Sequence, residues 1–231
     1  MCNKTLLGRA FLLSCMLSGF LATAWLLVAL QAQQAPAQAT RTVVLENELV
    51  LVVEVRAEAG SQIEMHEHPD MMVVVLEPRP GKNLQTNRRF EWAKGETRRG
   101  TGFYQPAERA GGPATVINAA RAIVIEFKQP APKPEAARNP SLPLPYKTTG
   151  ENTHAVQFEA TAAPGQTTPE HSHGNHLMVA LNDGITEMAE KGGQSIRLEW
   201  KKDTVRFGPP VTHTSTNVGK TPFEWILIEL K

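Results

Sequence analysis

Residues 165–176 read Gly-Gln-Thr-Thr-Pro-Glu-His-Ser-His-Gly-Asn-His and place three of the seven histidines within six positions. Alternate side chains of a β-strand point to the same face, so His171 and His173 are expected to point together into whatever the strand encloses. The apolar run 177–181 follows, and the turn residues Asn-Asp-Gly come next. Two imidazoles on one strand face form half of a metal site, and the other half must come from elsewhere in the chain.

A third histidine, His213, lies about forty residues later and opens the segment His-Thr-Ser-Thr-Asn, after a Gly-Pro-Pro break. This spacing suits a β-barrel whose interior holds one ion. We predict His171, His173 and His213 as ligands of a divalent transition metal ion, with Fe, Zn, Mn, Cu and Ni not distinguished. The alternative is that the three imidazoles form hydrogen bonds inside a barrel without metal.

His176 is the fourth candidate ligand. Its residue number is even, whereas those of His171 and His173 are odd. In one regular strand the side chain of His176 would therefore point to the opposite face, outward. A bulge at Gly174-Asn175 could turn it inward. Without such a bulge, His176 is a residue of the rim or the surface.

These motifs resemble those of the cupin superfamily. The first cupin motif reads Gly, five residues, His-x-His, three or four residues and Glu, which Gly165, His171 and His173 match. The second motif ends in His-x-x-x-Asn, which His213 and Asn217 match. The glutamate is missing, because Leu177 and Met178 stand at its two positions. The resemblance implies a jelly-roll barrel, and some cupin dioxygenases have three-histidine sites without the glutamate.

The two halves of the chain are repeats. The motif Gly-x5-His-x-His occurs at 60–68 and again 105 residues later. The segments 123–128 and 226–231 also match, as Ile-Val-Ile-Glu-Phe-Lys and Ile-Leu-Ile-Glu-Leu-Lys. Short strand patterns dominate and no helical periodicity appears after the first forty residues, so the fold class is all-β. The chain thus resembles a bicupin: two jelly-roll barrels at 40–128 and 147–231, joined by a proline-rich linker at 129–146.

The first repeat keeps fewer of the expected ligands. His66 and His68 remain, but alignment of the repeats puts Arg109 where His213 stands, with Glu108 beside it. A guanidinium stays protonated and is no metal ligand. Asp70 has the parity to supply an oxygen ligand. The simpler hypothesis is that the first barrel only stabilises the second.

Residues 1–39 are expected to lie outside the fold. Lys4 and Arg9 precede the uncharged run 10–30, and Ala37-Gln38-Ala39 offers a cleavage site, as in a signal peptide. This predicts export to the periplasm or the extracellular space. The alternative is retention in a membrane through residues 10–30, which are long enough to span a bilayer. Both cysteines lie in this segment, so any metal in the mature chain must use His, Asp, Glu or backbone oxygen.

Two functions from different classes remain open. A net charge of +1 and 6% aromatic residues argue against a nucleic-acid partner. The first hypothesis is a metal-dependent enzyme, of dioxygenase or other type, acting on a small organic molecule. The second is a bicupin that binds a small ligand or serves a structural role without metal or catalysis. The resemblance also allows a homodimer.

Overall fold

The computed structural model describes residues 37–63, 67–77, 84–85, 98–105, 114–116, 120–132 and 142–231. These residues form β-strands joined by turns, with no helix among them, and the expected all-β class is confirmed. Consequently none of the residues described belongs to a helix able to cross a bilayer. Residues 1–36 of the expected signal or anchor at 1–39, as well as His66, Glu108 and Arg109, lie outside these ranges. Residues 37–39 were expected outside the fold as well, but Ala37 and Ala39 form backbone hydrogen bonds with Gln62, at 2.8 and 2.9 Å.

The first half contains one five-stranded and one three-stranded antiparallel sheet. The larger sheet has the order β1-β2-β8-β4-β6 and the smaller one β3-β7-β5. The strands are β1 (Thr40–Glu46), β2 (Val50–Ala57), β3 (Gln62–Ile63), β4 (Met71–Val75), β5 (Leu84–Gln85), β6 (Gly102–Gln105), β7 (Ala114–Val116) and β8 (Ala120–Phe127).

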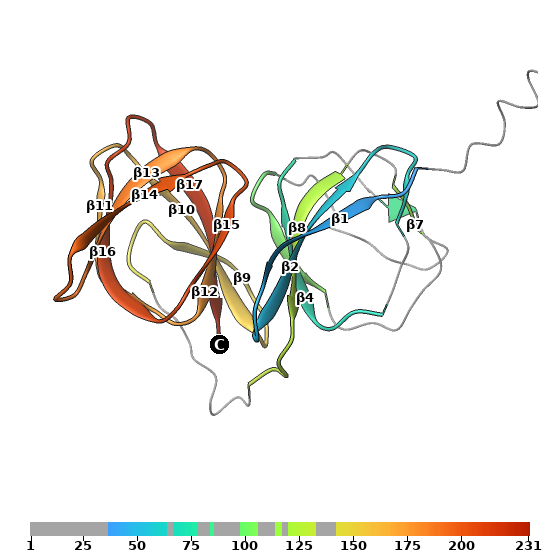
Figure 1. Cartoon of the computed structure of the whole chain (residues 1–231), viewed down its shortest axis with the longest axis horizontal. Coiled ribbons are helices and arrows are strands. Elements are labelled where there is room, and N and C mark those ends of the chain that lie inside the picture. Colours follow the sequence, from blue (N-terminus) through green and yellow to red (C-terminus); the bar gives the residue numbers. More distant parts are fainter. Residues whose placement is uncertain are drawn as a thin grey trace, which may run out of the picture. The chain divides into compact units, whose positions relative to one another are not determined.

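The second half repeats this topology. Its larger sheet has the order β9-β10-β17-β12-β15 when read from the other edge, and its second sheet is β11-β16-β13-β14. Figure 1 shows these strands, coloured yellow to red, curling into a roll. The strands are β9 (Lys147–Glu151), β10 (Ala155–Ala162), β11 (Thr167–His173), β12 (His176–Ala180), β13 (Gly184–Glu190), β14 (Ser195–Trp200), β15 (Val205–Gly208), β16 (Val211–Asn217) and β17 (Phe223–Leu230). The matching strand orders confirm the internal repeat.

The larger sheet of the second half is apolar on both faces, as expected for a sheet buried on both sides. On β12, Leu177 and Val179 pack with Val52 and Ile125 of the first half. Met178 and Ala180 alternate with them and face the interior of the second roll. The two halves therefore share one hydrophobic core, and the second roll has a core of its own.

Charged residues also join the halves at the edge of this shared core. The Asp203 carboxylate accepts hydrogen bonds from the guanidinium groups of Arg99 and Arg121. Arg99 donates as well to the carbonyl of Leu181, at 2.9 Å. Asp203 has φ of 70°, a left-handed conformation that aspartate tolerates better than most residues. A half-buried carboxylate thus bridges two cations from the other half of the chain, and Arg121 also pairs with Glu54 at 2.5 Å.

Candidate metal centre

A bulge in β11 aims the first two histidines into the second roll. The pairing of β11 with β16 shifts register between Thr168 and His171. Thr168 and His171 would face opposite sides of a regular strand, yet both are buried. The one extra residue at Pro169-Glu170 therefore restores the inward direction at His171. His173 lies two residues further and points inward as well, as the alternation of a strand predicts.

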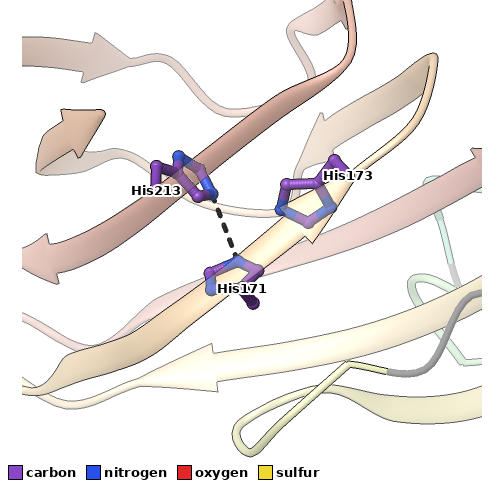
Figure 2. Close-up of side chains that lie close together, drawn as sticks. All are labelled: His171, His173 and His213. Carbon is purple, nitrogen blue, oxygen red and sulfur yellow. Dashed lines mark hydrogen bonds between the residues drawn. The ribbon is translucent and has the colours of Figure 1, made fainter. Parts of the chain in front are cut away.

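The third histidine, His213, lies on β16, the strand that pairs with β11. His213 of β16 pairs directly with His171 of β11, and their Nε2 atoms are 3.1 Å apart. Each of His171, His173 and His213 offers a nitrogen within 4.8 Å of the other two. Figure 2 shows the three rings gathered between the two strands. All three side chains are buried, and the geometry expected from the sequence is present.

Hydrogen bonds fix the proton position on two of the rings. His171 Nδ1 donates to the carbonyl of Pro169 at 2.6 Å, and His173 Nδ1 donates to the carboxylate of Glu229. A nitrogen that donates carries the proton, so the lone pair of each ring lies on Nε2. Among the described residues, His213 Nε2 has only His171 Nε2 as partner, and its buried Nδ1 has none. Neither nitrogen of His213 is committed to a group outside the cluster.

Burial favours the uncharged form of two of these imidazoles. Desolvation lowers the pKa of His213 to about 3, and repulsion from His171, His173 and His176 adds to the effect. Desolvation also lowers the pKa of His171, against the opposing hydrogen bond to Pro169. A neutral imidazole is the form that binds metal. His171 and His213 therefore present lone pairs at neutral pH.

The donor set fits a transition metal ion. Nitrogens bound to one zinc ion lie about 2.0–2.1 Å from it, so separations of roughly 3–4 Å between them surround a common point. The contact between His171 and His213 meets this condition. A metal ion between these two rings would also accept the lone pairs of both Nε2 atoms, which otherwise face each other. Three protein ligands leave at least one coordination position open, as in catalytic rather than structural zinc sites.

Glu229 is a site residue that the sequence analysis missed. Its carboxylate is fully buried, and it accepts hydrogen bonds from His173 Nδ1 and, at 3.0 Å, from the amide of Gly174. The available signal was a charged residue inside the apolar strand 226–230. Its equivalent in the first repeat, Glu126, instead binds Arg41 at 2.8 Å. Glu229 thus holds the ring of His173 and fixes its tautomer.

We expect Glu229→Gln to weaken metal binding by about 10- to 100-fold, the usual cost of losing a carboxylate behind a histidine ligand. The amide keeps the size of the side chain but removes the charge that orients His173. Competition with a chelator of known affinity measures the change. Glu126→Gln, at the equivalent position of the first repeat, is the matched control and should leave the affinity unchanged. Equal affinities of Glu229→Gln and the parent would contradict the role of Glu229.

His176 lies outside the three-histidine group. The chain leaves β11 after His173 and enters β12, a strand of the other sheet, at His176. The parity argument assumed one continuous strand, whereas the break at Gly174-Asn175 restarts the alternation and points His176 inward with Met178. Its ring lies 4.6 Å from that of His173, and a Cβ on Gly208 would come within 2.3 Å of its Nε2. His176 therefore lines the site beside the triad.

A cavity of about 440 Å³ adjoins the histidines. His173, His176 and His213 line it together with an aromatic wall of Tyr146, Trp200, Phe223 and Trp225. Tyr146, which falls in the predicted linker, contacts His171 at 5.4 Å between ring centroids. Burial, and to a lesser extent Glu229, raises the pKa of Tyr146, so its hydroxyl stays protonated.

Three residues of the two motif segments lie away from the centre. Leu177, at one of the positions of the missing glutamate, faces the core shared with the first half. Asn217, at the end of the second motif, donates to the carbonyls of Ala162 and Thr221 and accepts from the amide of Gly219. Glu170 pairs with Lys191 at 3.0 Å on the surface. Their side chains build the roll or its exterior rather than the centre.

In the first half, the described residues contain no second group of three metal ligands. His68 is buried and donates through Nδ1 to the carbonyl of Pro69 at 2.8 Å. Asp70 lies 2.7 Å from Nε2 of His154, whose ring stacks on Phe127 at 4.5 Å. Asp70 and His154 therefore connect the two halves, and His154 gains a role that the sequence did not reveal.

Comparison with known proteins identifies the fold. No family model matches the sequence, and no curated protein matches it. Solved structures match over most of the chain. AerE from Microcystis aeruginosa has a TM-score of 0.56 and 13% identity, covering 84% of this chain and 98% of its own. A cupin 2 conserved barrel domain protein from Leptotrichia buccalis has a TM-score of 0.51 and 13% identity, covering 88% and 94%.

A variant of oxalate decarboxylase from Bacillus subtilis matches with a TM-score of 0.54 and 13% identity, covering 85% of this chain and 74% of its own. These coverages span both repeats. The chain therefore has the fold of the cupin superfamily, as its motifs suggested.

Proposed function

We propose that the second roll binds one divalent transition metal ion through His171, His173 and His213, and that the cavity beside it holds a small organic molecule. The observation that carries the proposal is the convergence of three buried imidazoles from two strands on one point at the cavity wall. Manganese is one candidate, since the oxalate decarboxylase of Bacillus subtilis contains Mn(II) centres. The donor set suits iron, zinc, copper and nickel equally well.

A metal ion at this point would supply a Lewis acid with an open position, able to polarise an oxygen of the bound molecule or to activate water or dioxygen. The surrounding protein residues fix the orientation of the histidine ligands. Glu229 holds His173 in one tautomer, and the Pro169 carbonyl does the same for His171. The aromatic wall excludes water from the cavity, which strengthens electrostatic interactions inside it.

We further propose that the mature protein acts outside the cytoplasm, after removal of residues 1–39 or anchored through residues 10–30. The charge pattern of this segment and the lack of cysteine after residue 15 support export. An exported protein would meet its organic ligand in the periplasm or the extracellular space.

The second candidate function is non-catalytic binding of a small ligand without metal. The absence of a carboxylate from the three-histidine group favours it, because the usual cupin motif includes a glutamate. In this reading the hydrogen bond between His171 and His213 is a structural contact, and the cavity is a binding pocket only.

Elemental analysis of the mature protein decides between the two. The metal-centre proposal expects about one transition metal ion per chain. It also expects a chelator to lower the melting temperature and metal to restore it, because a ligand of the folded state alone raises stability. If the protein is purified without metal and its melting temperature does not change when Zn, Fe, Mn, Cu or Ni is added, the second candidate, non-catalytic ligand binding, would be established instead.

A further inference from the structure

We infer that the ligand of the second roll is an aromatic monocarboxylate of one or two rings, whose carboxylate binds Arg206 at the cavity wall while its ring lies against the stacked aromatics. The inference builds on the proposed function, because it assigns a substrate class to the same cavity. It differs from the dicarboxylate chemistry that the name of the neighbour oxalate decarboxylase indicates.

A row of aromatic side chains forms one wall of the cavity. Phe223 stacks on Trp200 with centroids 5.8 Å apart and on Trp225 with centroids 5.1 Å apart. Tyr146 continues the row, edge-on to Trp225 at 5.7 Å, and reaches His171. Rings prefer offset or edge contacts with other rings. This wall offers such contacts along its length and ends at the three histidines.

The rest of the lining is mainly apolar. Met178, Met188, Leu198, Phe207 and the pair Pro209-Pro210 contribute to it. A cavity of about 440 Å³ lies in the usual range for sites of small organic ligands. A two-carbon dicarboxylate would leave most of this apolar surface without a partner. A ring system fills it and removes that surface from water.

One arginine offers the matching charge. Arg206 is the single Lys or Arg among the described residues that line the cavity, and Glu190 is the single carboxylate there. On β15, Arg206 pairs with Met178 of β12, which faces the interior of the second roll, so Arg206 lies on the inward face. Arg206 is therefore the one cation that can pair with a ligand carboxylate, and the carboxylate of Glu190 would repel a second one.

The guanidinium of Arg206 is already held in place. It lies 4.4 Å from the ring of Trp200, and one Nη2–H donates to the carbonyl of Glu199 at 2.6 Å. Arginine has five N–H donors in a planar fork that fits a carboxylate. The remaining donors sit at the edge of the aromatic wall, so one molecule can contact both.

The test measures binding of three probes to the mature chain by calorimetry, before and after removal of metal with a chelator. The probes are 2-naphthoate, its uncharged analogue 2-naphthamide, and oxalate. The chelator-treated protein is expected to bind 2-naphthoate and to bind oxalate much more weakly. Arg206→Gln should weaken 2-naphthoate binding by about tenfold or more and leave 2-naphthamide unchanged, because only the acid uses the guanidinium. Arg206 is exposed, so the substitution is compatible with folding.

Three results would overturn the inference: no binding of 2-naphthoate, binding of oxalate as tight as that of 2-naphthoate, or equal affinities of Arg206→Gln and the parent for 2-naphthoate. None of them touches the metal assignment, which elemental analysis tests separately. A chain without metal that still discriminates between the probes would keep this inference and refute the metal centre.

Discussion

Substituting His171 by alanine is expected to reduce the metal content of the purified protein from about one ion per chain to less than about a tenth of that value. His171 supplies one of three nitrogens, and its Nε2 is 3.1 Å from that of His213. Two remaining imidazoles cannot hold an ion against dilution and washing as three can. Inductively coupled plasma mass spectrometry of parent and variant measures the loss, and the thermal stabilisation by added metal should disappear with it.

Two variants of the same region serve as controls for His171→Ala. Ser172→Ala alters the residue between the two ligands, whose exposed hydroxyl contacts Thr212 at 2.7 Å on the outer face, and should keep the full metal content. His176→Ala removes the histidine that lies outside the triad and should keep most of it. Metal retained in His171→Ala at the level of Ser172→Ala would refute the metal centre.

The second large effect is expected at the junction of the two halves. Asp203→Asn should lower the free energy of unfolding by about 3 kcal/mol, because it leaves the half-buried cations Arg99 and Arg121 without their shared anion. Asparagine tolerates the left-handed backbone at this position, so the substitution removes the charge with little added backbone strain. Urea denaturation followed by tryptophan fluorescence gives the change in midpoint.

Asp183→Asn is the matched control for this substitution. Asp183 forms its ion pair with Lys201 at 3.3 Å on the exposed surface, where such pairs contribute little. Its denaturation midpoint should stay at the parental value. If Asp203→Asn unfolded at the same urea concentration as Asp183→Asn, the ion pairs at the junction would have no energetic importance.

The sequence predicted the features that depend on spacing. A strand repeats every two residues, so His171 and His173 had to share a face, and the position of His213 about forty residues later suited a β-barrel that encloses one ion. The internal repeat, visible in the two segments ending Glu-Phe-Lys and Glu-Leu-Lys, emerged as two sheets with the same strand order. These are local patterns that tertiary contacts do not alter.

Features that depend on where one strand ends were not predictable. The break at Gly174-Asn175 moves the chain to the other sheet and points His176 inward, as the bulge at this position would and a regular strand would not. Tyr146 and Glu229 reach the centre from distant segments, and the charged residue in the apolar strand 226–230 does not by itself show which histidine it meets. Asn217 occupies the expected motif position but donates to the backbone carbonyls of Ala162 and Thr221.

The shared core gives the first repeat a structural role that does not depend on a ligand. The face of β12 and β17 that turns away from the cavity is covered by apolar side chains of β2 and β8. Cut at residue 146, the second roll would expose this face to water and tend to associate with other copies of itself. The first repeat therefore acts as a permanently tethered subunit, and the tether makes this pairing independent of protein concentration.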